Sequence, residues 1–203
     1  MTDERLARQF QYRLLDKGEL RDYHENGYHR YGPILTASGL EEMRRQCMIA
    51  WDSQKGSFDP SKTWLENALL VNIHHQSHIV RDFYFEGPLV DVAQQIIGSN
   101  IKGATSQLTF KMKGNTKPFP WHQDNGYGEL EPYNAISCLT ALDDTDQENG
   151  CLWLIPGSSK QGQRKHEQQQ KAVDVNYRAE LRTQADESHA IAVPMKAGEC
   201  LFF

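Results

Sequence analysis

The chain has 203 residues, of which 38% are hydrophobic and 24% are charged, so it is long and apolar enough to bury the core of one large domain, and wholesale disorder is excluded. Lys and Arg number 22 against 27 Asp and Glu, and the resulting net charge of −5 lacks the basic surplus that nucleic-acid binding normally needs. No apolar run approaches the ~20 residues of a membrane-spanning helix.

The first residues and the cysteines predict a cytoplasmic protein. The opening MTDERLARQF is charged from its third residue, unlike a secretory signal. The cysteines are widely spaced and contain no CxxC pair, which is typical of reduced thiols rather than of a disulfide framework or a zinc site. They are Cys47, Cys138, Cys151 and Cys200.

The first hundred residues follow a mainly helical pattern with one short strand in it. Leu6, Phe10 and Leu14 recur at helical spacing and predict one face of an amphipathic helix. The pattern then breaks at residues 27–35, GYHRYGPIL, which read as a strand punctuated by a Gly-Pro pair.

Two further helices are predicted before residue 99. Ser38 and Glu41 have the spacing of a capping box that opens one of them. Pro88 and Gly98 are typical of the first turn and the C-terminal end of the other. The expected apolar faces consist of Leu40, Met43, Cys47 and Ala50 in the first helix, and of Leu89, Val92, Ala93, Ile96 and Ile97 in the second.

After residue 98 the hydrophobic period shortens toward two, which indicates strands. The expected strands cover residues 101–111, 119–123, 134–142, 151–155, 189–194 and 199–203. Helices followed by strands predict an α+β fold whose strands form a sandwich or barrel. We expect one domain over residues 1–203, helical to about residue 98. The polar, Gln-rich segment 158–171 is expected to be a solvated loop or a mobile lid.

The sharpest chemical candidate is the tetrapeptide WHQD, which contains His122 and Asp124. Side chains two residues apart on a strand point to the same face, so the imidazole and the carboxylate would converge. Inside a barrel they would supply two of the three ligands of a 2-His-1-carboxylate Fe(II) site. Alone, the HxD tripeptide is weak evidence for a metal site, since most such tripeptides are a surface pair or a simple His–Asp hydrogen bond.

A longer stretch gives this pair its context. Residues 121–162, WHQDNGYGELEPYNAISCLTALDDTDQENGCLWLIPGSSKQG, resemble the core of the phytanoyl-CoA dioxygenase family, whose members are iron(II)- and 2-oxoglutarate-dependent oxygenases. Residues 21–45 resemble the opening of that family, and AGECLFF at 197–203 resembles the strand before its last iron ligand. The resemblance therefore spans nearly the whole chain.

The resemblance implies a double-stranded β-helix, or cupin-like jelly roll, flanked by N-terminal helices. It implies that His122 and Asp124 bind Fe(II), and that 2-oxoglutarate and O₂ are consumed to hydroxylate a small organic substrate, with release of succinate and CO₂. Halogenating relatives carry a small residue at the position of Asp124, so its carboxylate favours hydroxylation.

The third iron ligand of the family, a histidine, and the arginine that binds 2-oxoglutarate follow the strand that 197–203 resembles, so both are expected after Phe203. The alternative is a degenerate relative that never forms the site. His166 and His189 are the only other downstream histidines. Both fit surface positions better than a third ligand position.

Polar residues on neighbouring predicted strands are candidates for binding 2-oxoglutarate by the same resemblance. Gln107, Thr109 and Lys111 alternate on one face of 101–111, and Thr140 lies on the strand after WHQD. From these we single out Gln107, Lys111 and Thr140. The alternative for the first strand is an edge position with one solvated face.

Two residues are candidates for substrate contact. Tyr127 lies in a Gly-rich loop and would otherwise anchor that loop. His74 lies in NIHHQSH at 72–78, in a region that is near the substrate entrance in family members. His74 and His78 also have the i, i+4 spacing of a helical zinc pair, although Asn72 and Ser77 favour a loop.

Two rival functions remain open at this point. One is a metal-dependent, non-oxidative enzyme on a cupin-like barrel, such as an isomerase or hydrolase. The other is a catalytically silent barrel that binds a small molecule or a protein partner. The expected partner of the oxygenase is a small-molecule substrate, with no nucleic acid and no membrane; the substrate and the oligomeric state are open.

Overall fold

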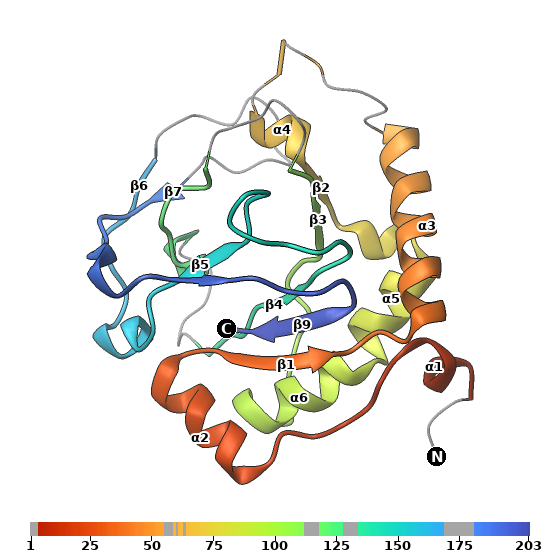
Figure 1. Cartoon of the computed structure of the whole chain (residues 1–203), viewed down its shortest axis with the longest axis horizontal. Coiled ribbons are helices and arrows are strands. Elements are labelled where there is room, and N and C mark those ends of the chain that lie inside the picture. The colour runs from red at the N-terminus through yellow and green to blue at the C-terminus, as the bar shows by residue number, and fades with distance from the viewer. Residues whose placement is uncertain are drawn as a thin grey trace.

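The computed structural model describes residues 4–54, 59, 61–62, 64–111, 118–127, 134–168 and 181–203 (Figure 1). Helices dominate its first half and strands its second half. The α-helices are α1 (Glu4–Gln9), α2 (Lys17–Asn26), α3 (Ala37–Gln54), α4 (Trp64–Ala68), α5 (His78–Phe85) and α6 (Pro88–Ile97). The 3₁₀ helices are η1 (Ile73–His75), η2 (Asp124–Tyr127), η3 (Ser158–Gln161) and η4 (Glu187–His189). The strands are β1 (His29–Pro33), β2 (Leu69–Val71), β3 (Gln107–Thr109), β4 (Cys138–Thr140), β5 (Leu152–Leu154), β6 (Glu167–Gln168), β7 (Leu181–Arg182), β8 (Ile191–Val193) and β9 (Glu199–Phe202).

The central sheet joins the two halves of the chain. Its order is β1-β9-β4, and both pairings are antiparallel, with His29 opposite Phe202 on one side of β9 and Cys138 opposite Phe202 on the other. The remaining pairs, β2-β3, β5-β8 and β6-β7, are also antiparallel. Because β1 comes from the helical half and β9 from the strand-rich half, the two halves share one sheet (Figure 1).

Strand β9 lies at the centre of the core because both of its faces are apolar. Cys200, Leu201 and Phe202 are exposed by only 2%, 0% and 1%. On one face, Cys200 and Phe202 belong to a hydrophobic cluster that includes Cys47, Trp51, Ile79, Phe83 and Val92 of α3, α5 and α6. On the other face, Leu201 belongs to a second cluster with Ala141, Val193 and Met195. The sheet is therefore covered by helices on one side and by the β8 region on the other.

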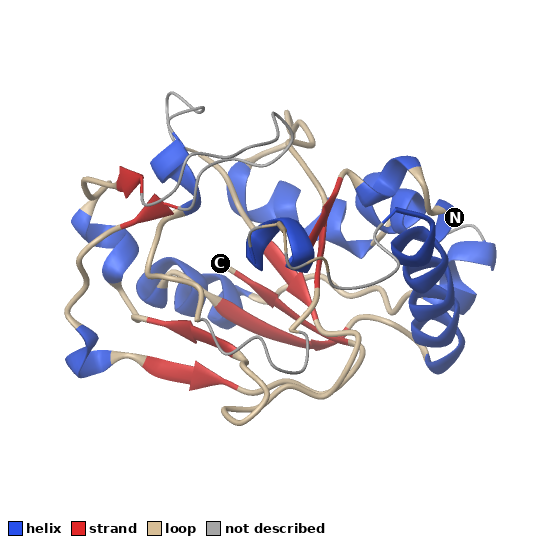
Figure 2. Cartoon of the chain, turned by 90° about the horizontal axis from the view of Figure 1, so that it is seen from above, coloured by secondary structure: helices blue, strands red, loops and turns tan. Residues whose placement is uncertain are grey.

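Figure 2 shows the helices next to the N-terminus at one end of the molecule, with the strands extending away from them. Close packing at that end depends on one glycine. A Cβ at Gly39, in the first turn of α3, would lie 1.9 Å from the carbonyl oxygen of Gln9, so only glycine lets the end of α1 approach α3. Within the described residues, no helix combines the length and apolar character needed to span a membrane.

The predicted ends of α6 and most of the predicted face of α3 are confirmed, with Leu40 only half-buried, whereas Val92 is the one fully buried residue of the predicted α6 face. Met43, Cys47 and Ala50 are buried on α3. Helix α6 runs from Pro88 in its first turn to Ile97, and Gly98 follows with φ of 99°.

The predicted cap of α3 is wrong by two residues. The hydroxyl of Thr36, not Ser38, accepts the backbone N–H of Gly39 at 3.0 Å. The Ser38 hydroxyl instead donates to the carbonyl of Arg8 at 2.9 Å. Thr36 is therefore the capping residue, and Ser38 connects α3 to α1.

The predicted helical face Leu6–Phe10–Leu14 is correct only for its first two members. Leu6 and Phe10 are buried, but Leu14 is 60% exposed. Helix α1 ends at Gln9, and Phe10 forms an isolated β-bridge with Leu35, so the helical spacing no longer applies at residue 14.

The predicted strand over 119–123 is also wrong. Residues 118–123 have no regular secondary structure, and η2 begins at Asp124. Pro118 and Pro120 have no backbone N–H to donate to a neighbouring strand, which disfavours a sheet position here. Strands β3, β4, β5, β8 and β9 all lie within their predicted ranges, but β3 and β4 are much shorter than the predicted 101–111 and 134–142.

Candidate metal site

His122 and Asp124 come together although neither lies on a strand. His122 Nε2 lies 3.6 Å from Asp124 Oδ1. The turn into η2 brings the side chains to one point, in place of the strand alternation that the sequence suggested. The two side chains are 32% and 49% exposed, so the pair is open to solvent and to small molecules.

The ring of His122 is oriented by a backbone carbonyl. Its Nδ1 lies 2.8 Å from the carbonyl oxygen of Pro120, which can only accept a hydrogen bond, so Nδ1 carries a proton. In the neutral imidazole the lone pair is then on Nε2, the nitrogen nearer Asp124. Metal-binding histidines usually have their other ring N–H bound in this way to a carbonyl or carboxylate.

The carboxylate of Asp124 is held from the other side. Its Oδ2 accepts a hydrogen bond from the hydroxyl of Ser137, the residue before β4. A hydrogen bond from His122, which exists only while Nε2 carries a proton, lowers the pKa of Asp124 most strongly, and the Ser137 hydroxyl adds to this, outweighing the opposing effect of desolvation. Asp124 is therefore an anion at neutral pH, and a divalent cation next to Nε2 could replace the proton that a His–Asp pair would otherwise share.

The chemistry of this pair suits Fe(II). One imidazole nitrogen and one carboxylate oxygen are two of the donors in a 2-His-1-carboxylate site. Next to them, the buried side-chain oxygen of Asn125 has no hydrogen-bond partner in the described part of the chain. Three or more His, Cys, Asp or Glu side chains do not gather into a possible metal site anywhere in that part. Among the described residues, His122 and Asp124 are therefore the two candidate donors.

Neither of the other downstream histidines is placed as a ligand. His189 is exposed in η4. Both ring nitrogens of His166 already have partners, because Nδ1 lies 2.8 Å from the carbonyl of Arg164 and Nε2 accepts the backbone N–H of Gln123 at 2.9 Å. His166 is half-buried rather than on the surface, where the sequence placed it.

The polar alternation predicted near β3 is present. Gln107 and Thr109 are exposed and Leu108 between them is buried. Lys111 follows this strand, and its ammonium lies 5.0 Å from the centre of the Phe119 ring, close in sequence to His122. Desolvation lowers the pKa of Lys111, although part of the side chain reaches solvent.

Thr140 is half-buried on β4, opposite Cys200 of β9. Tyr127 is the last residue of η2, and its side chain lies outside the described part of the chain.

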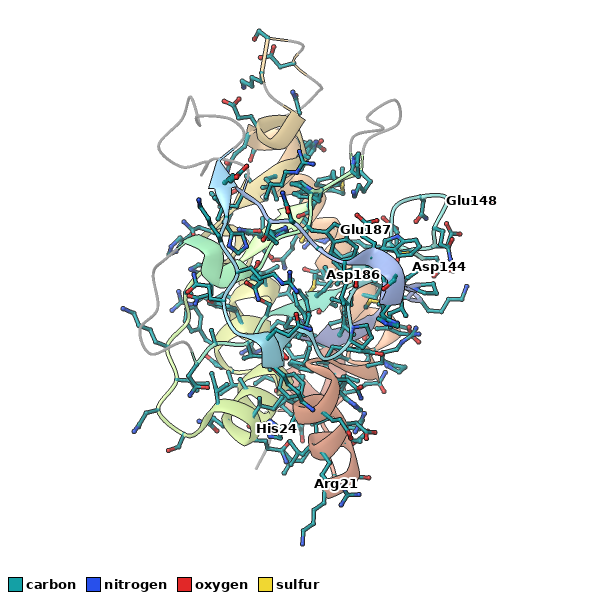
Figure 3. All side chains as sticks on the ribbon, turned by 90° about the vertical axis from the view of Figure 1, so that its left-hand side faces the viewer. Arg21, His24, Asp144, Glu148, Asp186 and Glu187 are labelled. Atoms are coloured by element: carbon teal, nitrogen blue, oxygen red, sulfur yellow. The ribbon has the colours of Figure 1, made fainter. Side chains whose placement is uncertain are left out.

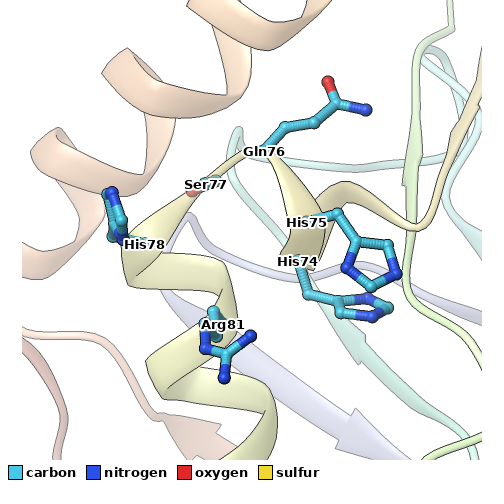
Figure 4. Close-up of a pocket in the computed structure, with 6 residues that line it drawn as sticks. All are labelled: His74, His75, Gln76, Ser77, His78 and Arg81. Atoms are coloured by element: carbon cyan, nitrogen blue, oxygen red, sulfur yellow. The ribbon is translucent and has the colours of Figure 1, made fainter.

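His74 lines a pocket of about 300 Å³ together with His75, Gln76, Ser77, His78 and Arg81 (Figure 4). His74 is 9% exposed, and its Nδ1 lies 2.7 Å from the hydroxyl oxygen of Ser106. Burial lowers its pKa, and the nearby His75 and Arg81 add to this effect.

The alternative of a helical zinc pair is not supported by this geometry. His74 lies in η1, and His78 is the first residue of α5. Figure 4 shows the rings of His74 and His75 side by side, whereas His78 points away from them.

Sequence reasoning missed the residues that hold this site in place. The carbonyl of Pro120 and the hydroxyl of Ser137 orient the two donors, and the loop that contains His166 binds the backbone between them. The Pro-x-Pro pattern before WHQD was the one signal that this segment needed partners other than a neighbouring strand.

Comparisons with known proteins agree with this fold. A model of the family described as Phytanoyl-CoA dioxygenase (PhyH) matches residues 23–203. The phytanoyl-CoA dioxygenase of Arabidopsis thaliana is 30% identical over 90 residues, which are 44% of this chain and 32% of the relative. The ectoine dioxygenase of Bordetella bronchiseptica is 29% identical over 148 residues, 66% of this chain and 48% of the relative. The chain thus spans about half or less of the length of these relatives.

Two solved structures show the architecture. EvdO2 from Micromonospora carbonacea var. aurantiaca, complexed with 2-oxoglutarate, has a TM-score of 0.72 at 16% identity and covers 95% of this chain and 82% of its own. EctD from S. alaskensis, with 2-oxoglutarate and 5-hydroxyectoine, has a TM-score of 0.70 at 20% identity and covers 93% of this chain and 67% of its own. The predicted fold class, an α+β double-stranded β-helix with flanking N-terminal helices, is confirmed.

Proposed function

This chain belongs to the phytanoyl-CoA dioxygenase family, and on that basis we propose that the protein is a non-haem Fe(II)- and 2-oxoglutarate-dependent dioxygenase. The observation that carries the proposal is the pair His122–Asp124. Its nitrogen and oxygen lie 3.6 Å apart, the imidazole is oriented by a carbonyl, and the carboxyl group has a lowered pKa.

In this proposal His122 Nε2 and Asp124 Oδ1 bind the metal. The bound iron, with 2-oxoglutarate and O₂, supplies the oxidising chemistry that hydroxylates a substrate and releases succinate and CO₂. The carbonyl of Pro120 keeps the lone pair of His122 on Nε2, and the Ser137 hydroxyl limits rotation of the Asp124 carboxylate. The third ligand, a histidine, and the arginine for 2-oxoglutarate are expected after Phe203 in the complete natural protein.

Three polar residues are proposed to bind 2-oxoglutarate. Lys111 offers a cation beside the segment that leads to His122, and its desolvated ammonium favours an anionic partner because charges attract more strongly where water is scarce. Gln107 lies on the exposed face of the strand before Lys111, and Thr140 lies on β4, three residues after Ser137. Both offer hydrogen bonds to a carboxylate.

The substrate is proposed to be a small organic molecule, with Tyr127 and His74 in contact with it. The named relatives act as dioxygenases of phytanoyl-CoA and of ectoine, two small molecules of different chemistry. We also propose that residues 1–203 form one domain and that the protein is cytoplasmic.

The test is 2-oxoglutarate turnover by the complete natural chain, measured as succinate formation with Fe(II) and O₂ present. Asp124→Ala is expected to reduce the rate below detection. Asp186→Ala, which alters an exposed aspartate before η4 (Figure 3), is the matched control and should leave the rate unchanged. A wild-type protein that forms no succinate, or an Asp124→Ala variant that forms it at the normal rate, contradicts the proposal.

A further inference from the structure

We infer that His166 is a positioning residue for the candidate metal site, because it holds the backbone of the one residue that separates the two proposed ligands. This inference rests on the proposed function for its consequence, metal binding. The contact itself is a property of the chain without metal. His166 lies more than forty positions away in the sequence, yet its Nε2 lies 2.9 Å from the backbone nitrogen of Gln123.

The two contacts of the His166 ring require one protonation state. The carbonyl of Arg164, 2.8 Å from Nδ1, only accepts hydrogen bonds, so Nδ1 carries the proton. The backbone N–H of Gln123 only donates, so Nε2 carries the lone pair. Both requirements describe the same neutral tautomer. A ring with a fixed partner at each nitrogen cannot turn without losing one of them.

The same loop binds Gln123 and its neighbours by further hydrogen bonds. The side-chain amide of Gln123 donates to the carbonyl of Gly162 at 3.1 Å and accepts the backbone N–H of Arg164 at 2.8 Å. The side chain of Gln163 donates to the carbonyl of Asn125 at 2.9 Å. Residues 162–166 therefore hold residues 123–125 on both sides of Asp124.

A glycine makes room for the ring. A Cβ at Gly126 would lie 2.7 Å from the His166 ring, closer than any non-bonded carbon contact allows. The segment that contains the proposed ligands therefore approaches His166 at a distance that only glycine permits.

This contact matters because residues 118–123 have no regular secondary structure. Another backbone contact of this segment is the N–H of Thr183, which donates to the carbonyl of Trp121 at 2.8 Å. Without His166, the Gln123 N–H loses its partner. The remaining hydrogen bonds from residues 162–164 hold the Gln123 side chain and the Asn125 carbonyl, but not the peptide group between His122 and Gln123, which can then shift. A shift of about 1 Å is enough to spoil a metal geometry, and loss of an outer hydrogen-bond partner typically weakens metal binding about 10–100-fold.

The experiment compares three variants of the complete natural chain. His166→Phe keeps a flat ring and removes the acceptor. His166→Gln retains an acceptor oxygen near the position of Nε2. His24→Phe changes an exposed histidine of α2 (Figure 3) in the same way and is the matched control.

The first readout needs no metal: amide hydrogen exchange at Gln123, followed by NMR in the apo-protein. The Gln123 amide should exchange slowly in wild type, in His24→Phe and in His166→Gln, and quickly in His166→Phe. An unchanged rate in His166→Phe overturns the inference. A His166→Phe variant that fails to fold leaves the decision to His166→Gln, in which loss of protection at Gln123 overturns it.

The second readout is Fe(II) affinity. His166→Phe should bind Fe(II) about 10–100-fold more weakly than wild type, with His166→Gln between the two and His24→Phe unchanged. Fast exchange at Gln123 with unaltered Fe(II) affinity overturns the link between His166 and the metal. A wild-type protein that binds no Fe(II) overturns the proposed function instead, and the exchange rates still decide whether His166 holds the segment.

Discussion

The central strand β9 and the segment around His122 are held in opposite ways. Cys200, Leu201 and Phe202 have almost no exposed surface, and strands pair with β9 on both edges. His122 and Asp124 are partly exposed, and hydrogen bonds hold their segment: one to the Pro120 carbonyl, one from the Ser137 hydroxyl and several with the 162–166 loop. Hydrophobic burial therefore fixes the scaffold, while directional hydrogen bonds fix the donors, so changes in one should leave the other largely intact.

The largest expected effect comes from removing a donor without touching the core. His122→Ala should abolish 2-oxoglutarate turnover while changing the free energy of unfolding by less than about 0.5 kcal/mol, because the side chain is partly exposed and lies outside the two hydrophobic clusters. Succinate formation and urea unfolding measure the two quantities. Turnover at the wild-type rate would remove His122 from the site.

The converse change removes core volume and leaves the donors in place. Leu201→Ala should lower the free energy of unfolding by about 2–5 kcal/mol, because Leu201 is fully buried on β9. Leu14→Ala, at a residue that is 60% exposed, should cost less than about 0.5 kcal/mol. Urea unfolding of both variants is the measurement. Equal losses would contradict the assignment of Leu201 to the core and Leu14 to the surface.

A smaller effect should follow from freeing one oxygen of Asp124. Ser137→Ala removes the hydroxyl that donates to Asp124 Oδ2 and retains the paired backbone bonds between Ser137 and Phe203. We expect Fe(II) to bind about tenfold more weakly, which is the smallest loss typical of removing a hydrogen-bond partner from a metal ligand. Ser159→Ala, at an exposed position in η3, is the control. Matching affinities in the two variants would show that Ser137 does not orient the carboxylate.

A change far from the site tests the corrected start of α3. Thr36→Ala should cost about 1 kcal/mol of unfolding free energy, because the Gly39 N–H loses its acceptor. Ser38→Ala should lower the unfolding free energy by less, because the carbonyl of Arg8 still accepts a hydrogen bond from the Thr36 hydroxyl at 2.6 Å. Urea unfolding decides the order, and a larger loss in Ser38→Ala would restore the cap that the sequence suggested.

The smallest effect is a pH-dependent one on the surface of α3. Hydrogen bonds from Arg45 and then Gln46 lower the pKa of Glu42 from 4.5 to about 2. The folded state thus favours the charged form, so the contribution to stability is present above pH 4.5 and is lost as the pH falls from 4.5 toward 2. Exposure to solvent limits it to less than about 1 kcal/mol.

Glu42→Gln should therefore be less stable than wild type in urea at neutral pH. The difference in unfolding free energy should shrink as the pH falls below 4.5, the pKa of an ordinary glutamate. A difference that grows toward acid pH would contradict the assignment. Glu41→Gln, the same change at the neighbouring exposed residue, is the control.

Local periodicity predicted what depends on local structure. It predicted the apolar face of α3, the ends of α6 and the positions of β5, β8 and β9, because alternation and helical spacing record which side of an element is buried. It did not predict that β1 pairs with β9, since no pattern within either strand specifies a partner far along the chain.

The sequence predicted which two residues make up the candidate site, but not the backbone conformation or the hydrogen bonds that bring them together. The sequence suggested that His122 and Asp124 converge, and they do. They converge through the turn into η2 rather than along a strand, because Pro118 and Pro120 disfavour a strand in this segment. The supporting contacts of Ser137 and His166 come from distant segments and leave no local pattern. That His122 and Asp124 bind a metal, and that Ser137 and His166 position them for it, stays a prediction.

The most direct test of the central claim is an anaerobic titration of the complete natural chain with Fe(II) and 2-oxoglutarate, observed through the weak visible charge-transfer band of the chelate. If His122 and Asp124 bind Fe(II), the band appears and saturates in wild type and in His24→Ala, and it is missing in His122→Ala. A wild-type protein without the band, or a His122→Ala variant with the same band, would contradict that claim.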